Sequence, residues 1–494
     1  MVIVRVDCPV ATTEPEPEAG FAASARVRPA SGRPVPVGRE RAFGLDEMFF
    51  STTDAKGRIV SGNRVFERVS GYAAGELIGQ PHNLVRHPDM PRAVFQLLWD
   101  YLGAGRPIAA YVKNMAADGA YYWVLATALP VPGGYLSVRI KPSTPYLAVV
   151  EEAYREVLAL ERSLEQGGTL RKDAIAESLA QLGSIVVASG FRDYDAFMSA
   201  ALAAELANRE RARGAVTGAT AGGGATSVPE LGEILGSCAL VERHMGMLFD
   251  ALEGFARVNE TLVGKAAFVL DLADSVRLLA LNAMISSARL ERDGEVLGAV
   301  AGMLGVRSHA IAGIVSAVSA DLDEILGLLG GLEFRVSLAK LQTEMTACFA
   351  RELGEPHERT APLGGRRVED DLALLGCCLR TGAEEAFDSL RALDVALGRV
   401  GGHVRRLTSG LKALGALQTG GRIEATRTDA GSFVLIFREV AEQVAAARTE
   451  LSEIERIARE SRTITVSRGE LLTREHLSRI DAHATRLADA RPSS

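Results

Sequence analysis

The stretch GQPHNLVRHPDMP, residues 79–91, brings together the side chains of this chain that are best suited to chemistry. It contains two imidazoles, an amide, a guanidinium and a carboxylate, on His82, Asn83, Arg86, His87 and Asp89. Such groups can ligate a metal, transfer protons or form the polar rim of a ligand pocket. Pro81, Pro88 and Pro91 restrict the backbone around them, which pre-organises the segment.

A metal site is disfavoured, because zinc sites usually use more closely spaced ligand pairs than His82, His87 and Asp89 provide. The sequence also lacks the GxxxxGK[ST], HExxH, EF-hand and GxSxG signatures. No nucleophile stands out beside a base and oxyanion donors. We therefore expect a protein that is not an enzyme and has neither catalytic residues nor a metal site. An alternative role for Asp89 is to cap the helix that begins near MPRAVFQLLW, with solvated histidines beside it.

The strand-like segments of the chain cluster around this stretch. They are bounded by the turn signals DAKG, ADG and PGG, and they cover Phe49–Thr53, Arg58–Ser61, Ile108–Asn114, Tyr121–Pro130 and Tyr135–Lys141. The region between the second and third segments has the pattern of short helices. The sequence therefore predicts an α+β domain with two strands, a helical crossover that carries the polar stretch, and a three-strand meander.

The rest of the chain is predicted to be almost wholly helical, because apolar residues recur at spacings of three and four. Two breaks rich in small or polar residues divide it. We expect a disordered tail at 1–45, the α+β domain at 46–145, a helical connector at 146–210, a flexible linker at 211–230, a helical segment at 231–352, a linker at 353–367, a second helical segment at 368–480 and a tail at 481–494.

Charge and hydropathy narrow the possible partners. The net charge is −7 and no basic block occurs, so a nucleic-acid or anionic-membrane surface is disfavoured. The longest uncharged apolar run, Val296–Val306, is far shorter than the roughly 20 residues of a membrane helix. The first residues lack the features of a secretory signal. We expect a cytoplasmic protein without a membrane span.

Residues 51–131 resemble the PAS domain of the bacterial aerotaxis receptor type. The motifs SGY, GQPHNLVRHPDMP, VKN and YYWV carry the resemblance, in the order and spacing of that family. It implies a five-stranded antiparallel sheet with helices over one face and FAD held between them. The family's Arg-His-x-Asp motif, which helps to hold the flavin, corresponds to Arg86, His87 and Asp89. Four further residues match family positions near the pocket: His82, Asn83, Asn63 and Trp99.

The residue types agree with this implied role. Arg86 offers a fixed fork of donors suited to a diphosphate or a flavin carbonyl. His87 can donate or accept a hydrogen bond, and Asp89 can orient either neighbour. One departure is Ile108, at a position where the family often has an aromatic residue. This difference keeps two alternatives open, a haem pocket and a pocket without a cofactor.

The segment DSVRLLALNAMISSARLERDGEVLGAVAGML, residues 274–304, resembles the hairpin tip of methyl-accepting chemotaxis proteins. Ser286 and Arg292 replace the two glutamates of that tip. The resemblance implies a helical hairpin with a coiled-coil-like dimer seam. It also implies contacts with a chemotaxis kinase and its coupling protein, but the residues that make them in the family are largely changed here.

Together these patterns predict an α+β PAS domain followed by a long, mostly α-helical, coiled-coil-like region. The expected function is that of an aerotaxis-like signal-transduction sensor. In it, an FAD-binding PAS domain reports redox or oxygen state through the helices to a protein partner, and the chain is a homodimer. The alternatives are a cofactor-free PAS adaptor for dimerisation and partner binding, and a haem-based gas sensor.

Overall fold

The computed structural model describes residues 34–216, 228–288, 295–355, 367–427, 431–465 and 469–489. The chain divides into two compact units. Unit 1 takes residues up to 247 together with 333–386 and 469–494, and unit 2 takes 248–332 and 387–468. The polar stretch at 79–91 belongs to unit 1.

Unit 1 contains a five-stranded antiparallel sheet in the order β2-β1-β5-β4-β3. In chain order the elements are β1 (Met48–Asp54), β2 (Ile59–Gly62), α1 (Arg64–Ser70), α2 (Ala74–Leu77), the 3-10 helix η1 (His82–Val85), α3 (Arg92–Gly103), β3 (Ile108–Met115), β4 (Tyr121–Val131) and β5 (Gly134–Ile140). This confirms the predicted five strands and helical crossover. Each predicted strand end lies within one residue of its observed position.

The two faces of the sheet have different neighbours, because side chains alternate along each strand. On β1, Ser51 and Thr53 face a cavity beside α3. Phe50 and Thr52 point to the other face, where the Phe50 ring packs edge-on against Phe349 with 4.9 Å between ring centroids. One strand therefore contacts both the cavity and a distant helix.

Of the three helices that follow β5, α6 (Tyr194–Val216) packs against β3 on this second face, and the Tyr154 hydroxyl of α4 (Tyr146–Gln166) donates to the Tyr111 carbonyl. The third helix, α5 (Arg171–Ala188), packs against α4 and α3. Glu205 of α6 is fully buried and accepts hydrogen bonds from the hydroxyls of Tyr111, Ser143 and Thr144. It also accepts bonds from the backbone N–H groups of Ser143 and Thr144. A buried carboxylate needs such partners to offset its lost hydration, so Glu205 fixes α6 to the sheet.

The segment that precedes β1 also packs on the sheet. The predicted tail at 1–45 lies in part outside the described residues, and its described portion, 34–45, pairs with the turn between β3 and β4. Arg41 N donates to the Tyr121 carbonyl at 2.7 Å, and both Arg39 and Arg41 form ion pairs with Asp118. Phe43 is buried against Phe49. The folded region therefore begins before residue 46.

The remaining elements are long helices: α7 (Pro229–Ser287), α8 (Glu295–Gly354), α9 (Val368–Arg427), α10 (Gly431–Thr465) and α11 (Gly469–Asp489). α6 continues beyond the predicted connector end at 210, and α11 extends past the predicted start of the tail at 481. Most of the predicted linkers, at 217–227 and 356–366, lies outside the described residues. Within the described ranges, every helix is too short or too polar to cross a membrane.

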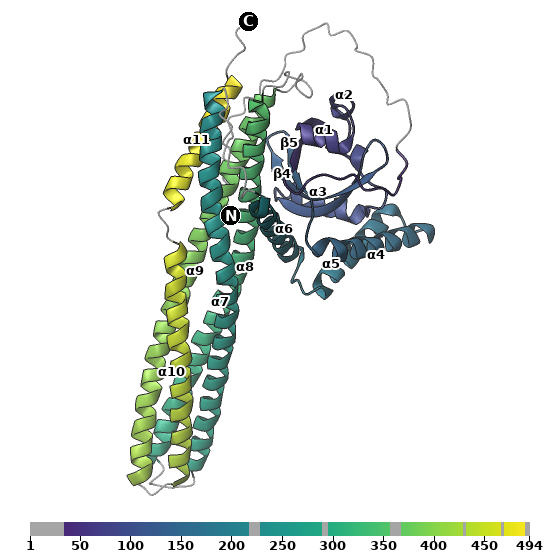
Figure 1. The fold of residues 1–494 in the computed structure, drawn as a ribbon. Coiled ribbons are helices and arrows are strands. Elements are labelled where there is room, and N and C mark those ends of the chain that lie inside the picture. Colours follow the sequence, from purple (N-terminus) through teal and green to yellow (C-terminus); the bar gives the residue numbers. More distant parts are fainter. Residues whose placement is uncertain are drawn as a thin grey trace. The chain divides into compact units, whose positions relative to one another are not determined.

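In unit 2, portions of α7, α8, α9 and α10 pack side by side as two hairpins (Figure 1). Lys265 of α7 pairs with Glu450 of α10 at 2.7 Å, and Arg399 of α9 pairs with Asp321 of α8 at 3.0 Å. Apolar residues from all four helices meet at one point of the core. The chain thus forms a four-helix bundle by itself, with the α9/α10 hairpin as the partner of the α7/α8 hairpin.

A substitution at Gly134 would test the tight contact between β5 and β1. A Cβ atom at this position would lie 1.8 Å from the Thr53 carbonyl oxygen, so the backbones would have to separate. We expect Gly134→Ala to lower the free energy of unfolding by roughly 2–4 kcal/mol. Urea unfolding followed by tryptophan fluorescence measures this, because Trp99 and Trp123 are the two tryptophans of the chain and both lie in this domain. Gly75→Ala, where a Cβ meets nothing within 4 Å, is the control; equal midpoints would contradict the expectation.

Candidate functional site

A cavity of about 260 Å³ lies between the inner face of the sheet, η1 and α3. Its walls combine apolar and aromatic side chains with a few polar groups, as small-molecule sites usually do. The lining residues are Ser51, Thr53, Lys56, Gly57, Pro81, His82, Asn83, Arg86, Phe95, Leu98, Trp99, Leu102, Val112, Asn114, Ala126, Ala128, Tyr135, Ser137 and Arg139. None of these described residues is acidic, so the wall carries basic groups without a carboxylate.

Arg139 on β5 is the most buried cation of this wall, at 5% exposure. One guanidinium nitrogen donates to Ser51 Oγ at 2.9 Å and another to His82 Nε2 at 2.8 Å. The rings of Phe49 and Phe66 lie within 6 Å of the guanidinium carbon. Burial lowers the pKa of Arg139 to about 10, which still leaves it charged at neutral pH. A buried cation with neutral hydrogen-bond partners favours an anionic group in the cavity.

His82 is held neutral beside this cation. Removal of the ring from solvent, and then the nearby charge of Arg139, lower the pKa of His82 to about 3. Arginine has no acceptor, so Nε2 of His82 accepts the bond and the proton of the neutral ring sits on Nδ1. His82 Nε2 also lies 3.1 Å from Ser51 Oγ. His82, Ser51 and Arg139 therefore form one polar cluster that joins η1, β1 and β5.

Arg86, Asn83 and Trp99, all expected from the sequence, line the cavity together with His82. Arg86 stacks over Phe95 at 4.0 Å from the ring centroid and donates to the Met90 carbonyl at 2.8 Å. These contacts fix its planar fork at the cavity wall. Trp99 lies at the rim, 44% exposed, with its ring edge-on to Tyr135.

His87 and Asp89 lie on the other side of the same loop. His87 lines a second, polar cavity of about 310 Å³ between the loop and α4, together with Arg86, Arg92 and Arg162. Burial and the charge of Lys113 lower the pKa of His87 against the opposing effect of Asp89. Partial burial would raise the pKa of Asp89, but its 2.9 Å hydrogen bond from Lys113 and the charges of Lys113, His87 and Arg162 together lower it. Asp89 lines neither cavity.

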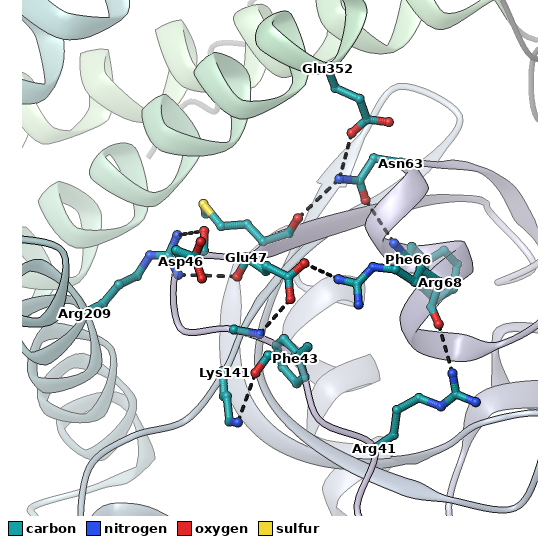
Figure 2. Close-up of polar contacts among 12 residues, drawn as sticks. Arg41, Phe43, Asp46, Glu47, Asn63, Phe66, Arg68, Lys141, Arg209 and Glu352 are labelled. Carbon is teal, nitrogen blue, oxygen red and sulfur yellow. Dashed lines mark hydrogen bonds and ion pairs between the residues drawn. The ribbon is translucent and has the colours of Figure 1, made fainter. Parts of the chain in front are cut away.

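Asn63 connects structural elements and does not line the cavity. It is the N-cap of α1, and its side-chain oxygen accepts a bond from Phe66 N. Its amide nitrogen donates to the Met48 carbonyl at 3.2 Å and to Glu352 of α8 at 3.4 Å (Figure 2). Asn63 is 3% exposed and does not line the cavity. The structure therefore places it between the sheet and α8.

The capping role considered for Asp89 is wrong. The N-cap of α3 is Pro91, and the first free N–H groups of that helix, on Arg92 and Ala93, donate to Glu161 of α4 at 3.1 and 2.8 Å. Glu161 is 1% exposed and caps α3 from another element. Within the described part of the chain, no three acidic, histidine or cysteine side chains form a cluster that could hold a metal ion.

Several polar residues of the cavity wall were not expected from the sequence, and Ser51, Asn114 and Arg139 are three of them. They lie on three different strands, far apart in the sequence. A signal for one of them is present, because YLSVRI places Tyr135, Ser137 and Arg139 on alternate positions of a strand whose other positions are apolar. An arginine on the inner face of a predicted strand indicates either an edge of the sheet or a binding site.

Known proteins resemble this domain in sequence. Residues 59–135 match the family described as the PAS fold. The aerotaxis receptor of Escherichia coli (strain K12) is 38% identical over 149 residues, which are 29% of this chain and 29% of that receptor. The nitrogen fixation regulatory protein of Klebsiella pneumoniae is 31% identical over 116 residues, 22% of this chain and 23% of that protein. The chain thus spans less than a third of the length of these curated relatives.

Similar solved structures include a PAS domain from Colwellia psychrerythraea, which is 22% identical, covers 19% of this chain and 85% of its own, and has a TM-score of 0.17. The light-state structure of the blue-light photoreceptor Aureochrome1 LOV is 25% identical, covers 20% of this chain and 85% of its own, and has a TM-score of 0.19. The sheet and helices of residues 48–140 form a PAS domain that resembles, in sequence, that of the aerotaxis receptor.

The lowered pKa of His82 predicts a pH-dependent stability. Between pH 6.5 and about 3 the unfolded chain takes up a proton at this ring while the folded domain does not. The free energy of unfolding therefore keeps its full value above pH 6.5 and falls on acidification, by up to roughly 1.4 kcal/mol per pH unit. We expect His82→Gln to remove most of this slope in urea unfolding curves between these pH values. His309→Gln, at an exposed helical position, should leave it unchanged. An unaltered slope in His82→Gln would refute the assignment.

Proposed function

We propose that this chain, whose PAS domain resembles that of the aerotaxis receptor, is a sensor that binds FAD and reports redox or oxygen state to a protein partner through its helices. The observation that carries the proposal is the buried Arg139 in a cavity wall without a carboxylate. A reporter of this kind needs no catalytic step. The cavity and the helical segments that contact the PAS domain lie in unit 1, and the hairpin tip proposed to meet the partner lies in unit 2.

The chemistry of the cavity suits a flavin ring. A flavin supplies reversible electron uptake, which adds negative charge or protons to its ring system. Arg139, hydrogen-bonded only to neutral groups among the described residues, would stabilise that negative charge. Asn114 and Arg86 add hydrogen-bond donors, while Phe95 and Trp99 supply aromatic surface. The volume lies near the lower end of the roughly 300–1,000 Å³ of small-molecule pockets, which favours a ring system over a whole dinucleotide.

The second cavity offers a place for the charged part of such a ligand. Arg86 and Asn83 line both cavities, so the loop between them could contact the ring on one side and the remainder of the molecule on the other. Arg92, Arg162 and His87 supply donors suited to phosphate oxygens, and two carboxylates, Glu161 and Glu165, line the same cavity. Glu165 pairs with Arg92 at 2.6 Å, so a phosphate would share Arg92 with that carboxylate. This arrangement favours FAD, which carries a diphosphate, over a flavin without one.

A route from the cavity to the helices runs along β1. Ser51 on its inner face contacts Arg139 and His82, whereas Phe50 and Thr52 on its outer face reach other elements. Thr52 Oγ1 bonds Ser61 Oγ, which donates to Asp371 of α9 at 2.8 Å. A charge change beside Arg139 would shift Ser51 and thereby the packing of its two strand neighbours. We propose that β1 can take two arrangements and that a bound ligand would favour one of them.

The helical region indicates which class of protein would be the partner. The α7/α8 hairpin carries the segment that resembles a chemoreceptor tip, and Ser286 stands where that tip has a glutamate. We propose a signalling protein related to the chemotaxis kinase or its coupling protein as the partner. The changed tip residues point to contacts that differ from those of the family.

The binding proposal is tested by titration of protein freed of ligand with FAD and with riboflavin. We expect Arg86→Ala to weaken both ligands by at least roughly tenfold, because Arg86 lines both cavities. His87→Ala should weaken FAD but leave riboflavin almost unchanged, because His87 lines the second cavity alone. Arg68→Ala, a surface change outside both cavities, is the control for folding and purification.

The absorption spectrum of the freshly purified protein separates this proposal from its alternatives. The visible bands of oxidised flavin support it, and a Soret band would establish the haem alternative instead. A protein that shows neither and does not bind added FAD would remove the basis of the sensor proposal. The cofactor-free adaptor would then be the better account.

The role of Arg139 predicts a shift in midpoint potential. We expect Arg139→Gln to make the potential of the bound flavin more negative by at least about 60 mV per one-electron step, because that is a tenfold weaker preference for the reduced form. Spectroelectrochemical titration measures the shift. Lys56→Gln removes a charge from an exposed position of the same cavity and should change the potential much less. Equal shifts in both variants would contradict a specific role for the buried guanidinium.

A further inference from the structure

The half of α8 that lies in unit 2 is unusually apolar. Between Val296 and Ala320, a span of 25 residues, Arg307 is the single residue with a fixed charge. A helix that is apolar on all sides is normally buried on all sides. Here one side is buried, through Leu297, Leu304, Ile311, Val315 and Val318, which face the core of the bundle.

The opposite side of α8 is exposed and apolar, and its residues recur at spacings of three and four. Val306, Val296 and Met303 on it are 72%, 52% and 49% exposed. We call this set the outer seam; it consists of Val296, Ala299, Met303, Val306, Ala310, Gly313, Ala317 and Ala320, of which only Ala317 is half-buried. This is the heptad pattern of a coiled-coil contact, repeated over about 36 Å of helix.

The second hairpin does not share this feature. The outward positions of α10 include Arg438, Glu439, Glu442 and Arg448, all exposed. Those of α9 include Arg399 and Arg405. The outer side of α8 is therefore neutral, whereas those of α9 and α10 are charged, and α7 exposes Asp271, Asp274 and Arg277. The core of the bundle does not require the outer seam, so the seam needs another explanation.

The order of side-chain sizes along the outer seam indicates what covers it. Large residues occupy the end near Val296, and small ones occupy the end near Ala320. If two copies of α8 run antiparallel about a twofold axis at residue 308, Met303 lies opposite Gly313, and Val306 lies opposite Ala310. Val296 then lies opposite Ala320, so the larger side chain of each of these pairs meets a small one. A parallel pair would instead place Met303 against Met303 and leave a gap at Gly313.

We propose that the outer seam is an interface at which two copies of this chain pair in antiparallel orientation through α8. The same surface serves on both copies, as a twofold contact requires. Its heptad positions match in the a-to-d manner of an antiparallel coiled coil. The seam residues themselves carry no charge, so the apolar contact buries no ion, and the one flanking charge, Arg307, lies one residue from the proposed twofold axis on each copy. This interface is distinct from the four-helix core, which the chain completes by itself.

The oligomeric state of the full chain tests the interface. We expect a molecular mass of twice the 52.5 kDa of one chain in sedimentation across the micromolar range. Val306→Glu should weaken the dimer by at least roughly 100-fold, because it would bury a carboxylate in each half of an apolar contact. Ile423→Glu, at a position on α9 that is 64% exposed, is the matched control and should leave the dimer intact.

A wild-type chain that stays monomeric would overturn the proposal, as would a dimer that Val306→Glu leaves unchanged. Circular dichroism establishes that each variant keeps its helices, and Ala310→Glu serves as a second variant. A monomer that binds phospholipid vesicles through this face would assign the seam to a membrane instead.

Cysteine cross-linking tests the antiparallel orientation. A mixture of Val306→Cys chains and Ala310→Cys chains should form disulfide-linked dimers under mild oxidation, at least tenfold more than either variant alone. Wild-type protein measures the background from the five cysteines already present. Cross-linking of Val306→Cys with itself, without cross-linking in the mixture, would establish a parallel pair and overturn the proposed geometry.

Discussion

The buried guanidinium of Arg139 is the constraint around which the candidate site is organised. A cation at this depth loses hydration, and its neighbours Ser51 and His82 return only neutral hydrogen bonds. The same charge helps to keep His82 unprotonated, so the cluster concentrates a single positive charge at the cavity wall. The ligand that we propose, whose negative charge rises on reduction, would give this cation the anionic partner that the wall does not supply.

The PAS domain connects to the helices through strands that have two occupied faces. β1 presents Ser51 to the cavity and Phe50 to Phe349, while β3 presents Asn114 to the cavity and Tyr111 to Glu205. Carboxylates on helices outside the sheet accept hydrogen bonds from polar groups of the PAS domain, as Figure 2 shows for Glu352 at Asn63. These contacts depend on the position of each strand, so a small displacement of a strand would change the packing of the helices. Asn63, expected near a ligand, takes part in this connection instead.

The helical region differs from the dimeric hairpin expected from its resemblance to chemoreceptor tips, because one chain supplies all four helices of the bundle. The sequence predicts a hairpin with a dimer seam, and in unit 2 the α9/α10 hairpin occupies that seam within one chain. Because the two hairpins belong to the same chain, their apolar heptads pack together without the loss of translational and rotational entropy that the association of two chains costs. Any contact with a second copy must then use another surface, and the neutral outer side of α8 differs from the charged outer sides of α9 and α10.

The sequence by itself determined the local features of this protein. Strand alternation, turn residues and helical periodicity predict five strands and the long helices, because these signals depend on near neighbours. The motif of residues 79–91 likewise indicates a binding loop, and His82, Asn83, Arg86 and Trp99 do line one cavity. Only the tertiary structure decided that Arg139 and Asn114 join them, that His87 faces a second cavity, and that Glu161 rather than Asp89 caps α3. These pairings join residues from separate strands and helices, and such contacts follow from how the elements pack, which no local pattern encodes.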